Sequence, residues 1–105
     1  MNLAVEIINE DNQICFLLDG EIDAYTAPIL KERLLPIFDE KDQQVYVNLE
    51  KVKYMDSTGL GVFIGAFKKA HQNNGRMIIG RPQPRIARLF DVTGLSKIME
   101  VETNE

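Results

Sequence analysis

The residues whose types and order could carry chemistry lie in one short segment, Tyr54-Met55-Asp56-Ser57-Thr58-Gly59-Leu60-Gly61. The segment follows a strand-like run at 45–49 and opens a helix-like run, so we expect the Ser57 hydroxyl at or beside a helix N-terminus. Unpaired N–H donors and the positive end of the helix dipole make that position tolerant of an added phosphate. Ser57 is therefore a phosphorylated switch, a nucleophile, or only the residue that caps the helix.

The residues around Ser57 argue against a hydrolase. A nucleophile elbow has the pattern Gly-x-Ser-x-Gly because its tight turn needs small neighbours on both sides, and Met55 occupies the first glycine position. The one histidine, His71, lies fourteen residues further along the same predicted helix. At ~1.5 Å rise per residue it is roughly 20 Å away, too far to act as the base for Ser57. We therefore do not expect an enzyme.

Other ligand-binding patterns are incomplete. A phosphate-binding P-loop needs a lysine after its second glycine, and none is present here. Gly59, Gly61 and Gly65 form Gly-x-Gly-x-x-x-Gly, one residue away from the dinucleotide-binding pattern. With one histidine, one cysteine and scattered carboxylates, we expect no metal site and no cofactor. His71 is interpreted as a solvated helix residue, and Cys15, which cannot form an internal disulfide, as a small core residue.

Two aspartates follow strand-like segments and directly precede helices. They are Asp23 and Asp56. They serve either as turn and cap residues or as a pair of carboxylates that flank Ser57 in space. Spacing alone favours a capping role for Ser57 and leaves both readings of the aspartates open.

The composition predicts one acidic domain. The chain has 105 residues, 45% of them apolar, which fits a single domain over 1–105 with a polar tail at about 102–105. Its 12 basic and 16 acidic residues give a net charge of −4. An acidic domain without a basic cluster repels nucleic-acid phosphate, so any effect on transcription should pass through another protein. We see no secretion signal and no apolar run of ~18 residues, and expect a cytoplasmic protein without membrane association.

Periodicity predicts the elements that precede the segment. Alternating apolar residues predict a strand over 3–7, and a run that is apolar on both faces predicts a central strand over 14–18, the two forming a hairpin. Apolar residues at helical spacing over 27–38 predict a helix. Thr26 should cap this helix, and Pro36 should kink it or end it early.

The segment itself should lead from a strand into a helix. Val45, Val47 and Leu49 form the strand, and an apolar helical face follows that stops at Asn73-Asn74-Gly75. Gly61 and Gly65, on another face of this helix, suggest that the backbone of a neighbour approaches closely.

The last third of the chain completes an α/β pattern. We expect a short strand over 77–79, a loop fixed by Pro82 and Pro84, a helix over 86–90 that closes near Gly94, and a last strand over 98–101. The order is ββαβαβα with that further strand. Strand, helix and strand over residues 45–80 imply a right-handed parallel crossover.

Four segments of the chain resemble the STAS domain, and specifically the bacterial anti-sigma factor antagonists. The segments are Gly20-Glu21-Ile22-Asp23, Tyr25-Thr26-Ala27-Pro28, 52–63 and Arg88-Leu89-Phe90-Asp91-Val92-Thr93-Gly94-Leu95. They occur in the family's order over nearly the whole chain, and the likeness is strongest to antagonists of the general stress sigma factor of Gram-positive bacteria. The resemblance implies a STAS fold with a mixed, mostly parallel sheet of about four to five strands and helices packed on it.

The resemblance also implies a partner-switching mechanism. In this family the unphosphorylated antagonist binds an anti-sigma factor that is also a serine kinase, which frees the sigma factor. The kinase, which itself binds the ATP, phosphorylates the serine matching Ser57 and so breaks the complex, and a PP2C-type serine phosphatase restores it. Thr58 matches the neighbouring serine or threonine of the motif, and we expect it to be either a minor phosphorylation site or a contact at the helix start. The expected partner-binding residues are Asp23, Tyr25, Met55, Asp56, Ser57, Thr58, Gly59 and Leu60, on a monomer or weak dimer.

Two features depart from the family pattern, and one other role stays open. Asn48 stands where many relatives carry aspartate, and the loop with Pro82 and Pro84 is unusual. The alternative role is a STAS scaffold or nucleotide-sensing module in a larger signalling assembly.

Overall fold

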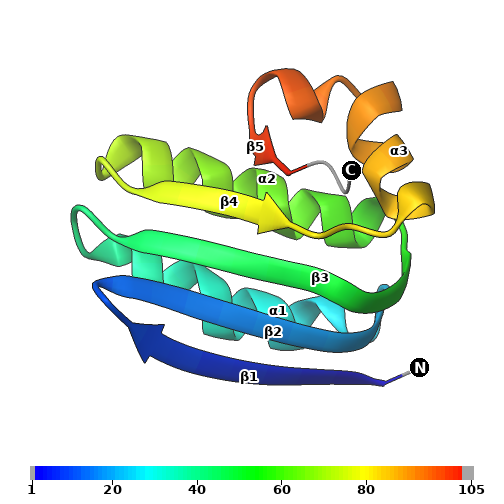
Figure 1. Cartoon of the computed structure of the whole chain (residues 1–105), viewed down its shortest axis with the longest axis horizontal. Helices are drawn as coiled ribbons and strands as arrows, with labels where there is room; N and C mark the ends of the chain where they lie inside the picture. Colours follow the sequence, from blue (N-terminus) through cyan, green and yellow to red (C-terminus); the bar gives the residue numbers. More distant parts are fainter. Residues whose placement is uncertain (1, 103–105) are drawn as a thin grey trace.

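A single five-stranded sheet organises the chain, with its strands in sequence order from one edge to the other (Figure 1). The computed structural model describes residues 2–102. The first two strands are antiparallel, and each later strand runs parallel to its neighbour. The strands are β1 (Leu3–Glu10), β2 (Gln13–Ile22), β3 (Gln44–Met55), β4 (Arg76–Gly80) and β5 (Glu100–Val101). The predicted α/β class and mostly parallel sheet are confirmed.

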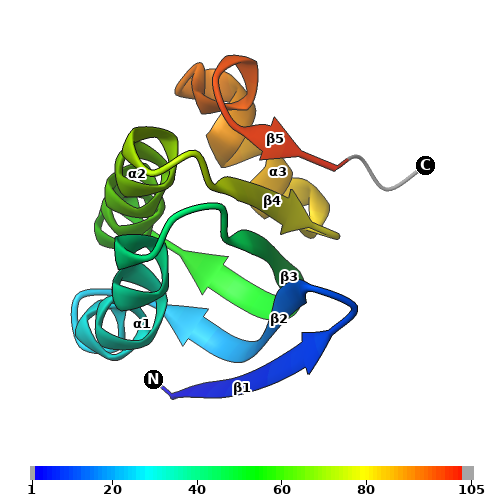
Figure 2. The same ribbon diagram turned by 90° about the vertical axis from the view of Figure 1, so that its left-hand side faces the viewer.

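The helices leave one face of the sheet open. Figure 2 shows α1 and α2 side by side on one face, whereas no helix of residues 2–102 covers the other. The helical elements are α1 (Ala27–Leu34), the 3₁₀ segment η1 (Leu35–Asp39), α2 (Ser57–Gln72), α3 (Pro84–Val92) and the 3₁₀ segment η2 (Leu95–Lys97). None of the helices among these residues has the length and apolar composition needed to cross a membrane.

The core lies between the sheet and the helical elements, and α1, η1, α2 and α3 all contribute buried side chains to it. Alternate residues of the strands point into it, as a strand's period of two requires, and the helices contribute their apolar stripes. Its largest fully buried side chains include four phenylalanines, and burial of each contributes roughly 1.5–3 kcal/mol. They are Phe16, Phe38, Phe63 and Phe90.

The first half of the chain agrees with the predicted elements in all but one detail. β2 lies between β1 and β3, as its apolar character on both faces predicted. α1 ends at Leu34 and continues only as the 3₁₀ segment η1, because Pro36 cannot donate the next helical hydrogen bond. Thr26 stands at the predicted cap position, but its hydroxyl does not cap the helix. It donates instead to the carbonyl of Glu21 at 2.7 Å.

The glycines of α2 correct another expectation. A Cβ on Gly61 would meet nothing within 4 Å, and one on Gly65 would make only an ordinary 3.7 Å contact with Leu35. The prediction that a neighbouring backbone approaches Gly61 and Gly65 closely is therefore wrong within the chain. A close approach occurs at Gly59, where a Cβ would lie 2.7 Å from side-chain atoms of both Ile22 and Met55.

The end of the chain differs in two details, and one prediction falls largely outside the described residues. Pro84 begins α3 rather than fixing a loop, since a proline suits the first turn of a helix. The last strand holds only Glu100 and Val101, so 98–99 lie outside it. The predicted tail at about 102–105 lies outside the described residues except for Glu102, which accepts a hydrogen bond from the Tyr46 hydroxyl at 2.5 Å.

Cys15 also departs from its predicted place. Its side chain is half-buried. It lies on the open face of the sheet, since it is paired with Tyr46 while its neighbour Phe16 points into the core. The interpretation of Cys15 as a core residue is therefore wrong.

Candidate regulatory site at the start of α2

The ends of β2 and β3 meet at one edge of the sheet. Ile22 pairs with Met55, and the next N–H along β3, that of Asp56, donates to the carbonyl of Ile22 at 3.2 Å. This arrangement places Asp23 and Asp56 side by side, as two parallel strands that end together require. Both line a surface hollow of about 300 Å³, together with Glu21, Ala24, Tyr25 and Tyr54.

Asp56 caps α2. Its backbone is extended (φ −110°, ψ −171°), and its Oδ1 accepts hydrogen bonds from the N–H groups of Thr58 at 2.9 Å and Gly59 at 3.4 Å. An N-cap side chain satisfies helix donors that would otherwise lack a partner. Because Asp56 fills this position, the interpretation of Ser57 as the cap is wrong.

Ser57 is the first residue of α2, and its hydroxyl is accessible. The residue is exposed, and no atom of residues 2–102 makes a hydrogen bond with this hydroxyl. Thr58 is exposed as well. His71 lies in the last turn of the same helix, where its ring stacks on Phe67 at a centroid distance of 6.2 Å. A serine with a free hydroxyl and no neighbouring histidine suits modification by another protein better than nucleophilic attack.

The first turn of α2 is held tightly against the sheet. The missing side chain of Gly59 lets the helix approach Ile22 and Met55. Met55 is 4% exposed and Leu60 7% exposed. Of the expected partner-binding residues, Met55, Gly59 and Leu60 are thus buried, and a partner cannot reach them without rearrangement. Their packing against the sheet fixes the position of the exposed residues Ser57 and Thr58.

A hydrogen-bonded turn fixes Asp23 beside this helix start. Its Oδ1 accepts from the N–H groups of Tyr25 at 2.9 Å and Thr26 at 3.0 Å. Its own N–H donates to the Thr26 hydroxyl oxygen at 2.9 Å, and its carbonyl accepts from Ala27. Asp23 is only 7% exposed, and the tight turn directs Tyr25 outward into solvent.

These hydrogen bonds keep Asp23 ionised. Burial alone would raise the pKa of this carboxyl, but the N–H groups of Thr26 and Tyr25 and the Thr26 hydroxyl outweigh that effect and lower it. Asp23 therefore presents a fixed negative charge to the hollow at neutral pH.

Two tyrosines flank the acidic hollow and give it the character of a protein-binding surface. Tyr25 is 80% exposed and Tyr54 is 46% exposed. Exposed aromatic residues around polar groups are typical of interfaces. Tyr54 and Glu21 also line the hollow and were not among the residues expected from the sequence to bind a partner. The pairing of Tyr54 with Glu21 across the strands is visible only in the structure.

The chain is similar to known proteins over nearly its whole length. The STAS domain family matches residues 3–105. The anti-sigma-B factor antagonist of Staphylococcus epidermidis is 46% identical over 101 residues, which cover 96% of this chain and 94% of that protein. The anti-sigma-B factor antagonist of Staphylococcus aureus (strain NCTC 8325 / PS 47) is 45% identical over the same length and coverage.

Solved structures share the fold. The unphosphorylated form of the anti-sigma factor antagonist SpoIIAA superposes with a TM-score of 0.79 at 24% identity, covering 96% of this chain and 90% of that chain. The phosphorylated form of SpoIIAA, a Bacillus cell fate determinant, superposes with a TM-score of 0.73 at 22% identity, covering 98% and 93%.

Proposed function

The chain belongs to the STAS-domain family, and we propose that it is an anti-sigma factor antagonist switched by phosphorylation of Ser57. The antagonist role is supported by the 45–46% identity to the staphylococcal anti-sigma-B factor antagonists over nearly the full length of both chains. The observation that carries the switch is the accessible Ser57 hydroxyl at the first position of α2, with the capping role taken by Asp56.

In the proposed cycle, the unphosphorylated protein binds an anti-sigma factor through the exposed part of this edge. The hollow places the carboxylates of Asp23 and Asp56 between the rings of Tyr25 and Tyr54. Carboxylates and aromatic faces together suit a cationic side chain, preferably arginine, of the anti-sigma factor. Binding there would release the sigma factor. The proposed partner is also a serine kinase, so the complex contains the enzyme that ends it.

Phosphorylation of Ser57 would weaken this contact through local charge and bulk. A phosphate adds about −1.5 to −2 charge at pH 7. It would stand beside the carboxylate of Asp56 and close to the hollow that Asp23 lines. Within the antagonist, the N-terminus of α2 partly compensates the new charge, so the fold survives. A loss of ~4 kcal/mol at the interface corresponds to roughly a thousandfold in affinity, enough to reverse a competition between partners.

The proposed cycle closes when a PP2C-type phosphatase removes the phosphate. For this step the phosphatase must reach a phosphate on Ser57, and the exposed position of the residue allows this. Thr58, also exposed, is proposed as a minor site.

The test uses the purified protein, its cognate anti-sigma kinase and ATP, with the modified site read by mass spectrometry. We expect phosphate on Ser57, loss of the complex, and recovery of the complex after phosphatase treatment. Ser57→Ala should bind constitutively and Ser57→Asp weakly, while Thr58→Ala, the matched control, should still be switched. Phosphate at another residue, or on Ser57 with no loss of binding, would refute the switch.

A further inference from the structure

The open face of the sheet carries a row of apolar side chains that the core does not use. The row runs across four strands, because Ile8 pairs with Cys15, Cys15 with Tyr46, and Tyr46 with Ile78. All four are half-buried. None of them belongs to the core or to the partly buried side chains that pack against it. This row accounts for the apolar character of β2 on both of its faces.

The ring of Tyr46 covers the end of β4 beside this row. Gly80 lies beneath the ring of Tyr46, and a Cβ on Gly80 would fall within 2.2 Å of the ring and its hydroxyl oxygen. The Tyr46 hydroxyl is held by Glu102. Next to the row, a hollow of about 370 Å³ is lined by Ala4, Leu17 and Asn48 among others, large enough for one anchoring side chain.

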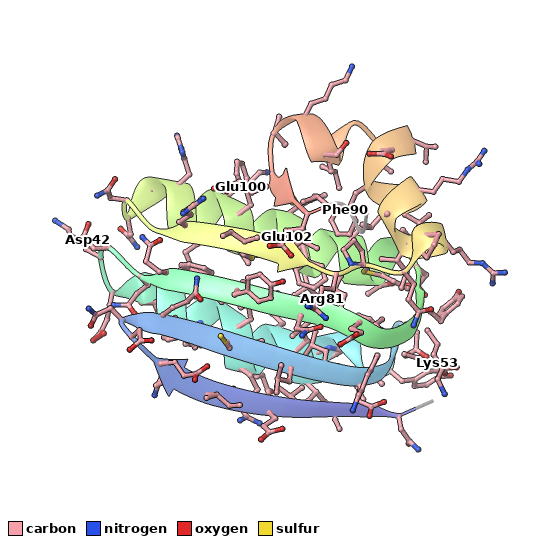
Figure 3. The ribbon with its side chains drawn as sticks, viewed as in Figure 1. Asp42, Lys53, Arg81, Phe90, Glu100 and Glu102 are labelled. Atoms are coloured by element: carbon pink, nitrogen blue, oxygen red, sulfur yellow. The ribbon has the colours of Figure 1, made fainter. Side chains whose placement is uncertain are left out.

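Acidic side chains form a rim around the row and the neighbouring hollow. Glu6 lies opposite Leu17, and Asp19 lies opposite Ala4, both exposed and both lining the hollow. Glu50 lines the hollow too, with Lys51 as the one basic residue there. Figure 3 looks onto this face and shows Glu100 and Glu102 along its other side, with Arg81 in front of the strands.

The basic residues on the rim are largely engaged within the chain. Arg76 is paired with Glu100 at 2.7 Å, and Arg81 lies 3.4 Å from Glu50. Lys51 lies opposite Asp19 in the backbone register of β2 and β3, and the side chain of Asp19 is exposed. The remaining charge of the rim is therefore negative, with Glu6 and Glu102 contributing to it.

The charge of the rim selects the occupant. A second copy packed face to face would bring acidic rims together, and like charges across an interface are unfavourable. Anionic lipid surfaces and nucleic acid are repelled for the same reason. An apolar row between acidic rims complements an amphipathic helix whose apolar stripe is bordered by lysine or arginine. At ~4.8 Å between strands the row spans about 14 Å, the length of roughly ten helical residues.

We propose that the open face of the sheet docks a basic amphipathic helix of a protein partner. The hollow of this face and the hollow beside Ser57 have no lining residue in common. Leu17 and the row Ile8, Cys15, Tyr46 and Ile78 receive the apolar stripe, and Glu6 and Asp19 receive its cations.

The test uses Cys15, the single cysteine of the chain, as a built-in reporter. Burial and then the charge of Glu10 raise the pKa of this thiol, so alkylation is followed above neutral pH. The probe is a synthetic leucine–lysine peptide of about 18 residues, long enough to form a helix with one apolar stripe. The control peptide has the same composition in an order without the stripe. We expect the amphipathic peptide alone to slow alkylation of Cys15.

Charge variants identify the surface. Glu6→Lys with Asp19→Lys should raise the peptide concentration needed for protection about tenfold, a loss of roughly 1.4 kcal/mol. Glu32→Lys with Glu40→Lys makes the same charge change at exposed residues outside the open face and should have no effect. Ser57→Asp should leave protection unchanged.

Four results would overturn the proposal. They are no protection up to roughly 1 mM peptide, equal protection by the control peptide, equal weakening by both pairs of charge variants, or amide chemical-shift changes confined to the Ser57 edge. Protection of Cys15 by self-association, by phosphatidylglycerol vesicles or by RNA in the absence of peptide would assign the face to that occupant instead.

Discussion

The packing beneath the candidate switch is tested by two glycines that lie two residues apart in α2. A Cβ at Gly59 would lie 2.7 Å from Ile22 Cγ2 and from Met55 Cγ, and 3.1 Å from Met55 Sδ. Ile22 and Met55 are core residues at the ends of adjacent strands, so neither can withdraw freely. At Gly61 the same atom would meet nothing within 4 Å. The two substitutions to alanine thus have equal chemistry and opposite surroundings.

The magnitudes follow from these distances. Overpacking a core costs about 1–3 kcal/mol, and replacing a helical glycine with alanine returns roughly 0.5–1 kcal/mol. Gly59→Ala should therefore lower the free energy of unfolding by up to about 2.5 kcal/mol, whereas Gly61→Ala should raise it by up to ~1 kcal/mol.

Urea denaturation measures both free energies. The denaturation slope should stay constant, since neither change alters the surface exposed on unfolding. Equal effects of the two variants, or a Gly59→Ala protein more stable than the parent, would refute the account of how the first turn of α2 is held. If Gly61→Ala is more stable but binds the anti-sigma kinase more weakly, the partner approaches the helix at Gly61.

Three further predictions concern single side chains. Asp56→Ala should lower the free energy of unfolding by about 1 kcal/mol because the helix loses its cap, whereas Asp56→Ser should retain most of that stability. Equal losses for the two variants in urea denaturation would contradict the capping role. Burial, followed by the hydrogen bond and charge of Glu102, raises the pKa of Tyr46 to about 12. The stability linked to this phenol is thus complete below about pH 10 and lost as pH rises toward 12. In an ultraviolet titration of the tyrosines, the step at the highest pH should be absent from the Tyr46→Phe variant. In the Glu102→Gln variant the same step should occur at a lower pH. The lowered pKa of Asp23 contributes stability above the pKa of the unfolded chain, about 3.9, and this is lost as pH falls through the folded value. Asp23→Asn should therefore lose less stability than the parent on acidification, and identical pH profiles would refute this.

The place of the site, after a strand and at the start of a helix, could be predicted from the residues around Ser57. For Asp23 and Asp56 the sequence left two readings open, as turn and cap residues or as carboxylates that flank Ser57. In the structure each of them accepts backbone hydrogen bonds, and both line one hollow. The helix start at Ser57 was expected from the change from strand-like to helix-like periodicity.

The capping residue could not be assigned in this way. Aspartate and serine are almost equally good caps and are neighbours here, so only the backbone geometry identifies Asp56 as the cap.

Packing partners were also beyond the sequence pattern. Gly59, Gly61 and Gly65 look alike in sequence, and which of them faces another element depends on how α2 lies on the sheet. Likewise, apolar residues on both faces of β2 predicted an interior strand correctly. They did not reveal that the helices cover one face only and leave Cys15 and Leu17 on the other.

The most direct test of the central claim is titration calorimetry of the anti-sigma kinase with two forms of the whole protein. One form is unmodified, and the other is quantitatively phosphorylated on Ser57. We predict a complex with the unmodified form and a loss of affinity of roughly a thousandfold, ~4 kcal/mol, for the phosphorylated form. Equal affinities for the two forms would contradict the proposal that Ser57 is the switch.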